Sequence, residues 1–84
     1  MTDQPIYERL NGIFRRQFKD DSLALTPETT ADDVRGWDSL AHIRLILSTE
    51  KEFGIKFRTS EVSAFKNVGD LAQMVKRKCA ERGR

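Results

Sequence analysis

The stretch Gly36-Trp-Asp-Ser-Leu-Ala-His-Ile-Arg-Leu-Ile-Leu-Ser-Thr-Glu-Lys-Glu-Phe-Gly54 decides the fold of this chain. Ser39 stands where a helix can start after a loop, and Gly54 suits the left-handed conformation that often ends a helix. An anion attached to a hydroxyl at that start is favoured by free backbone N–H groups and by the helix dipole. The pattern predicts a helix over residues 39–53, because apolar residues recur three or four positions apart and form one apolar stripe: Leu40, Ile43, Ile46, Leu47 and Phe53.

The length of 84 residues predicts one domain, which we place at residues 1–84 with a core over about 4–78. A domain of this size buries only about 60% of its unfolded surface, so a net stability of roughly 5 kcal/mol is expected. Charged residues make up 33% and hydrophobic residues 38% of the chain, which is typical of a soluble globular domain rather than a disordered one.

The sequence indicates a protein of the cytoplasm. It has no apolar run of 18 residues that could span a membrane, and its first residues lack the basic and apolar segments of a signal peptide. Its single cysteine, Cys79, cannot form an internal disulfide, which favours a reducing compartment.

The formal charge of +2 is unevenly distributed. Residues 76–84 hold five basic residues and one acidic residue, so this end carries +4 and residues 1–75 carry −2. One interpretation of the basic end is a nucleic-acid-binding surface, which makes a small helical nucleic-acid-binding module the alternative function. The preferred interpretation is a solvated helix end whose cations suit the helix dipole, with residues 79–84 fraying.

The rest of the chain predicts three further helices and no strand pair, and therefore an all-α four-helix bundle. A first helix is expected over residues 4–18, capped by Asp3, and a short third helix capped by Thr59 and reaching Ala64. Asn67 is expected to cap the last helix in a capping box with Asp70. Residues 19–37 are expected to form a long loop packed on the core, with a short helical turn around residues 30–34, and residues 54–57 an extended connection.

Three segments in this helical context resemble the acyl carrier proteins. They are Trp37-Asp38-Ser39-Leu40 after a long loop, the helix that ends with Glu50-Lys51-Glu52-Phe53-Gly54-Ile55, and the start of the last helix at Val68-Gly69-Asp70-Leu71. The resemblance covers about residues 4–78.

The resemblance implies a carrier that is not itself an enzyme. It implies that Ser39 takes 4′-phosphopantetheine from coenzyme A through a phosphopantetheinyl transferase, which would contact Asp38 and Leu40. The thiol of this arm would carry acyl or aminoacyl groups as thioesters between partner enzymes. A monomer is expected, with no nucleic-acid partner.

One feature departs from that family, whose members usually present an acidic second helix to their enzymes. Here the positions expected to face outward include Ala41, Arg44, Ser48 and Lys51, so two of them are basic. Leu45 is also expected to point outward as a docking contact. Because like charges disfavour docking to basic partners, the sequence favours a specialised carrier over a member serving the ordinary fatty-acid enzymes. Its pathway would be a secondary-metabolite, polyketide-like, surface-polysaccharide or amino-acid-activating one.

Other interpretations of these residues are weaker. Ser39 alone could be a plain helix N-cap, and this role can coexist with attachment. His42 is interpreted as a partly exposed helix position, since Asp38, Ser39 and His42 are too close in sequence for a catalytic triad. A hydrolase using Ser39 is therefore disfavoured, and Trp37 is expected to anchor the loop to the core. The sequence has no clustered His and Cys residues that would predict a metal site.

Overall fold

The structure is a computed structural model that describes residues 4–82. This part of the chain contains four α-helices and one 3-10 turn. The four-helix, all-α fold is therefore confirmed, with three helices of 15 residues and one of four. The elements are α1 (Gln4–Phe18), η1 (Ala31–Asp33), α2 (Ser39–Phe53), α3 (Thr59–Val62) and α4 (Val68–Arg82).

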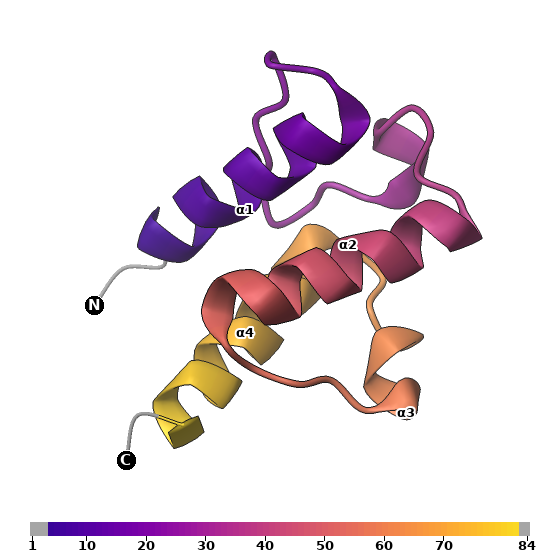
Figure 1. The fold of residues 1–84 in the computed structure, drawn as a ribbon. Coiled ribbons are helices and arrows are strands. Elements are labelled where there is room, and N and C mark those ends of the chain that lie inside the picture. Colours follow the sequence, from indigo (N-terminus) through magenta and orange to yellow (C-terminus); the bar gives the residue numbers. More distant parts are fainter. Residues whose placement is uncertain (1–3, 83–84) are drawn as a thin grey trace.

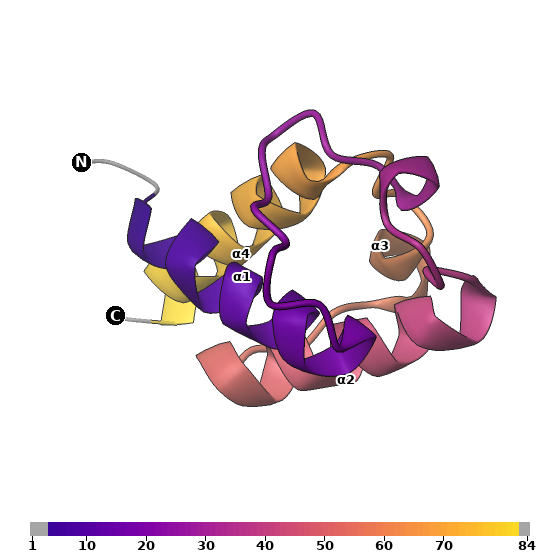
Figure 2. The same ribbon diagram turned by 90° about the horizontal axis from the view of Figure 1, so that it is seen from above.

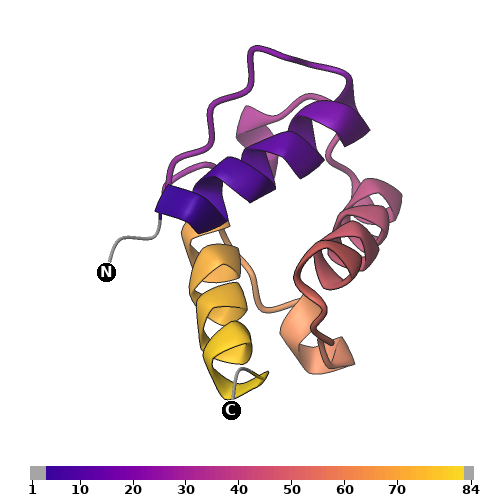
Figure 3. The same ribbon diagram turned by 60° about the vertical axis from the view of Figure 1, so that its left-hand side comes forward.

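The longer helices surround the core, and the short one closes it. Figures 1 and 3 show α1 lying across α2 and α4, with α3 on the side of the molecule opposite α1. The core combines side chains from all three longer helices, and the fully buried ones include Leu10 and Phe14 of α1, Leu45 of α2, and Val68 and Val75 of α4. The expected limits of α1 and α2 are confirmed; the proposed cap Asp3 lies outside the described residues.

The long loop between α1 and α2 is packed rather than free, as expected. Figure 2 shows it passing the start of α4 before it returns to α2. The Val68 N–H donates to the Thr29 carbonyl at 2.8 Å, and the Gly69 N–H donates to the Pro27 carbonyl at 2.9 Å. A Cβ atom at Gly69 would lie 2.9 Å from that same Pro27 oxygen, so the close approach requires glycine. The loop is therefore tied to the first turn of α4.

The face of α2 that enters the core differs from the predicted stripe. Ile46 and Phe53 are buried as expected, but Leu40, Ile43 and Leu47 are 60%, 53% and 58% exposed. Leu45, expected to point outward, is 0% exposed, so that prediction was wrong. Apolar residues occupy most of the circumference of this helix, and two faces therefore satisfy helical spacing equally well. The buried face is the one that runs through His42, Leu45, Ile46, Thr49 and Phe53.

The buried face of α2 includes a polar residue, Thr49. It is fully buried although it is polar, and its hydroxyl donates to the Leu45 carbonyl one turn earlier at 2.8 Å. That internal hydrogen bond removes most of the cost of burying a hydroxyl. A polar residue can therefore occupy the core face while three apolar residues remain outside it.

The ends of the other helices differ from prediction in detail. The N-cap of α3 is Arg58 instead of Thr59, and the helix stops at Val62. Asn67 does accept a hydrogen bond from the Asp70 N–H at 2.9 Å, but the Asp70 carboxylate accepts from the Lys66 N–H rather than completing a box with Asn67. The last helix continues to Arg82, beyond the point where fraying was expected.

Gly54 ends α2 as predicted, and the connection after it is extended. Gly54 has a left-handed backbone (φ 67°), and its N–H donates to the Glu50 carbonyl at 2.8 Å. Ile55 is buried, and Phe57 is half-buried with its N–H donating to Glu50 Oε2 at 2.7 Å. No strand forms within residues 4–82.

Candidate functional site

The start of α2 presents the hydroxyl of Ser39 to solvent. Asp38 is the N-cap, and its Oδ1 accepts a hydrogen bond from the Ala41 N–H at 2.9 Å. Ser39 is the first helical residue and is exposed, and its hydroxyl makes no hydrogen bond within residues 4–82. The interpretation of Ser39 as a plain helix cap was therefore wrong, because the preceding carboxylate performs that role.

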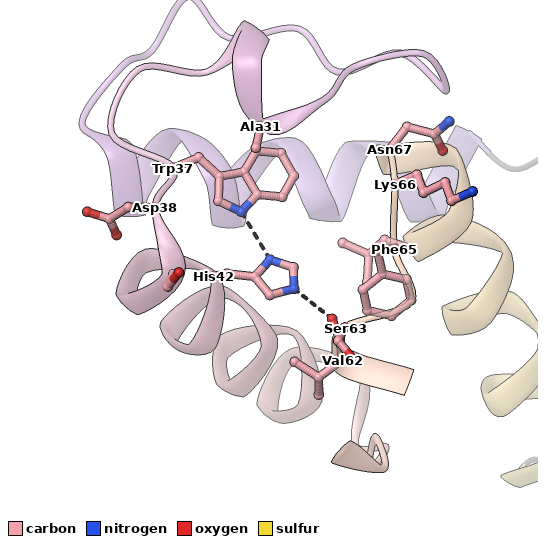
Figure 4. Close-up of a pocket in the computed structure, with 11 residues that line it drawn as sticks. Ala31, Trp37, Asp38, His42, Val62, Ser63, Phe65, Lys66 and Asn67 are labelled. Carbon is pink, nitrogen blue, oxygen red and sulfur yellow. Dashed lines mark hydrogen bonds between the residues drawn. The ribbon is translucent and has the colours of Figure 1, made fainter. Parts of the chain in front are cut away.

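His42 connects the loop before α2 to α3. The Trp37 Nε1–H donates to His42 Nδ1 at 3.0 Å, and His42 Nε2 lies 2.8 Å from the Val62 carbonyl oxygen. Figure 4 shows the three groups in one line across the site. The Trp37 and His42 rings are also stacked, with centroids 5.9 Å apart. We refer to Trp37, His42 and the Val62 carbonyl as the indole–imidazole latch.

The geometry of the latch assigns the His42 tautomer. An indole nitrogen can only donate, so His42 Nδ1 must accept, and Nε2–H must donate to the Val62 carbonyl. Both ring nitrogens are therefore occupied, and neither is available as a general base for Ser39. The expectation of a partly exposed histidine is confirmed, but no sequence signal pointed to the latch itself.

Trp37 anchors the loop, as expected. Its ring packs edge-on against Phe14 with centroids 5.2 Å apart, and against Phe18 at 6.3 Å. These contacts hold the residue before Asp38 in place, so aromatic side chains of α1 support the turn that leads into α2. Ser39 thus stands at a rigid helix start.

An open cavity of about 450 Å³ lies beside Ser39. Figure 4 shows Trp37 and His42 on one side of it and the connection between α3 and α4 on the other. Its wall is partly apolar, and its charged residues are Asp38 and Lys66. Six of the residues that line it are Trp37, Ser39, His42, Val62, Phe65 and Lys66.

The position of α3 depends on an ion pair as well as on the latch. The Lys78 ammonium lies 2.9 Å from Glu61 Oε1. The Arg58 backbone N–H, and next the hydrogen bond from Lys78, hold the pKa of the Glu61 carboxyl below its usual value. Because folding lowers this pKa, the stabilisation is present above the carboxyl's unfolded pKa and is lost as the pH falls through the folded value.

The other predicted site residues fall into two groups. Asp38, Leu40, Arg44 and Lys51 are exposed, whereas Leu45 is buried and cannot contact a partner. Within residues 4–82, no group of three or more His, Cys, Asp or Glu side chains is placed to hold a metal ion. None of the described helices is long and apolar enough to cross a bilayer.

Replacing His42 by alanine is expected to loosen α3 while α2 stays folded. The change leaves the Trp37 N–H and the Val62 carbonyl without partners, which should cost about 1–3 kcal/mol. Trp37 is the only tryptophan, so its fluorescence and its indole N–H resonance report on this site alone. Faster amide exchange in α3 is the expected result. Ser63→Ala in the same cavity wall is the control, and an unchanged indole resonance in His42→Ala would refute the latch.

Comparison with known proteins gives consistent matches over nearly the whole chain. Residues 8–75 match the family described as phosphopantetheine attachment site. An acyl carrier protein of Helicobacter pylori is 27% identical over 70 residues, which cover 83% of this chain and 90% of that protein.

Two solved structures also resemble the fold. The solution structure of a holo acyl carrier protein from Geobacter metallireducens has a TM-score of 0.87 at 49% identity, covering 93% of this chain and 90% of that one. The crystal structure of an acyl carrier protein from Thermotoga maritima has a TM-score of 0.83 at 25% identity, covering 95% and 93%. The match to the attachment-site family includes the start of α2, where Asp38 and Ser39 lie.

Proposed function

Because this chain belongs to the acyl carrier protein family, whose members bind 4′-phosphopantetheine covalently, we propose that Ser39 is its attachment residue. The observation that carries the proposal is a hydroxyl that is exposed, unbonded within residues 4–82, and fixed at the first position of a 15-residue helix. A carrier of this family is not an enzyme, and no catalytic role is assigned to Ser39.

The residues around Ser39 fit the attached group. The cavity of about 450 Å³ leaves open space beside the hydroxyl, and Ser39 is itself exposed. The backbone N–H groups of the first turn and the helix dipole favour the anionic phosphodiester, but by only about 0.3–1 kcal/mol. That is too little to drive attachment, so the transferase must activate coenzyme A. Asp38 and Leu40 flank Ser39 and are exposed, which makes them the expected transferase contacts.

The chemistry of attachment defines the role of this chain. Ser39 would hold the group: its oxygen would bond to the phosphorus that carries the pantetheine as the pyrophosphate bond to the nucleotide half of coenzyme A breaks, and the hydroxyl proton would be released. The bound group supplies a thiol that holds acyl or aminoacyl cargo as a thioester. The chain supplies position, because a tethered cargo meets a docked enzyme at an effective concentration on the order of mM.

The pathway that we propose is fatty-acid-like, polyketide-like or another specialised biosynthesis. The support for a specialised pathway is that Arg44 and Lys51 both lie on the exposed side of α2. We further propose that the chain acts in the cytoplasm as a monomer and as a single carrier domain. A nucleic-acid-binding role gains no support, because Lys78 of the basic end pairs with Glu61 of α3.

Incubation of the purified chain with coenzyme A and a broad-specificity phosphopantetheinyl transferase tests the proposal. The intact mass should rise by one 4′-phosphopantetheine, and fragmentation of the labelled peptide should place the increment on Ser39. Omission of the transferase is the control. A folded protein that gains no mass, or that carries the group on another residue, would contradict the assignment.

A further inference from the structure

The exposed face of α2 carries an apolar ridge. Leu40, Ile43 and Leu47 form it, and they are the only large apolar side chains within residues 4–82 that are strongly exposed, at 60%, 53% and 58%. All three belong to one helix, which forms an outer edge of the fold (Figure 3). Single exposed leucines are ordinary, but a concentration of every such residue on one surface indicates a site of contact.

A basic rim borders this ridge. Arg44 and Lys51 lie within the same arc of α2 as the ridge, about 100° wide at 3.6 residues per turn. Arg16 of α1 is exposed beside Arg44, where a hollow of about 410 Å³ is lined by Arg16, Arg44 and Leu47 among others. None of the three basic side chains pairs with a carboxylate within residues 4–82.

The two acidic residues of α2 interact with other parts of this chain. Glu52 pairs with Arg9 of α1 at 3.0 Å, and Glu50 Oε2 accepts the Phe57 N–H at 2.7 Å. Neither belongs to the arc that holds the ridge. The surface that α2 offers to another molecule is therefore apolar at its centre and positive at its border.

We propose that this surface docks an enzyme that presents an apolar hollow bordered by carboxylates. The inference rests on the proposed function and names the partner's chemistry. The basic rim of α2 is complementary in charge to carboxylates at the border of the partner's surface. The ridge supplies the apolar area whose removal from water favours association. Ser39 lies at one end of the ridge, so docking there brings the attachment residue to the partner's surface.

A second copy of this chain fits the surface poorly. A two-fold dimer through α2 would place Arg44 and Lys51 of one copy near the same residues of the other, and like charges facing each other oppose association. An anionic membrane would be complementary to the positive charges of Arg44 and Lys51. It offers no pocket for cargo that is attached at Ser39, however. The enzyme partner is therefore the occupant to which we commit.

The test uses the full, phosphopantetheine-loaded chain and two forms of one probe enzyme. The first form is an acyl-transferring enzyme with a basic carrier-docking patch, and the second has those lysines and arginines changed to glutamate. Affinity should be higher for the acidic form by about tenfold at low salt, and the difference should shrink as salt is added. The variant Arg44→Glu with Lys51→Glu should reverse the preference, and Leu47→Ser should weaken binding to both forms.

Matched controls separate this inference from the attachment proposal. Lys56→Glu with Arg77→Glu changes the net charge equally but alters exposed residues outside α2, so it should keep the wild-type preference. The intact mass of every variant records loading at Ser39 independently of docking. Equal affinity for the two enzyme forms, an equal effect of the control, Leu47-dependent self-association in sedimentation, or Arg44-dependent binding to phosphatidylglycerol vesicles would each overturn the proposal.

Discussion

Alanine in place of Ser39 is expected to abolish attachment of 4′-phosphopantetheine and to leave the fold intact. The structure separates two tasks that the sequence could not separate, since Asp38 caps α2 and Ser39 does not. The Ser39 hydroxyl has no hydrogen bond within residues 4–82 that the substitution would remove, and alanine is a good helix former. Incubation with coenzyme A and a transferase should give no mass increment, at an unchanged melting temperature.

The neighbouring carboxylate provides the matched control for this experiment. Asp38→Ala keeps the hydroxyl but removes the cap from the Ala41 N–H, which should lower the stability by about 1 kcal/mol. This variant should still be labelled, more slowly if Asp38 contacts the transferase. A mass gain in Ser39→Ala, or a loss of stability in Ser39→Ala as large as in Asp38→Ala, would show that the roles are assigned to the wrong residues.

Leu45→Ala is expected to remove most of the stability of the domain. Leu45 is 0% exposed and packs in the core with side chains of α1 and α4. Truncation of a buried leucine costs about 2–5 kcal/mol, and a domain of this size has roughly 5 kcal/mol in total. Urea denaturation followed by far-ultraviolet circular dichroism should show a large fall in the midpoint, with a substantial unfolded population before denaturant is added.

The control is a leucine two positions further along the same helix. Leu47 is 58% exposed, so Leu47→Ala should change the stability by no more than about 0.5 kcal/mol. The two variants remove the same atoms from the same helix, and only the direction of the side chain differs. A larger loss in Leu47→Ala than in Leu45→Ala would mean that α2 is rotated the other way, with the ridge in the core and the docking surface lost.

The limits of α1 and α2 and the turn at Gly54 were accessible to sequence reasoning because their signals are local. Apolar spacing gave residues 39–53, and the glycine that follows gave the end of the helix. The Asp-Ser-Leu segment at a helix start after a long loop gave the family resemblance, which the comparisons confirm at the level of the family. Apolar periodicity and the conformation of a helix-ending glycine depend on a few neighbouring residues, so both can be recognised without knowing the tertiary contacts.

The caps and the latch were less accessible because each depends on a choice between adjacent groups or on distant partners. Asp38 and Ser39 are both good N-caps, and only the backbone path decides which side chain meets the Ala41 N–H. His42 gains its role from Trp37 and from a carbonyl 20 residues away on α3. A single histidine in a sequence carries no sign of such partners.

The sequence by itself therefore determined that this chain forms four helices and displays a serine hydroxyl where the second one begins. The tertiary structure alone decided how that helix is rotated, and so which of its leucines is core and which is surface. The physical reason is that helical periodicity fixes the angles between the side chains around the helix axis, but not which side of the helix faces the core. That direction depends on which face of α2 packs against the core side chains of α1 and α4. The packing chosen here leaves Leu40, Ile43 and Leu47 exposed on the same side as Arg44 and Lys51.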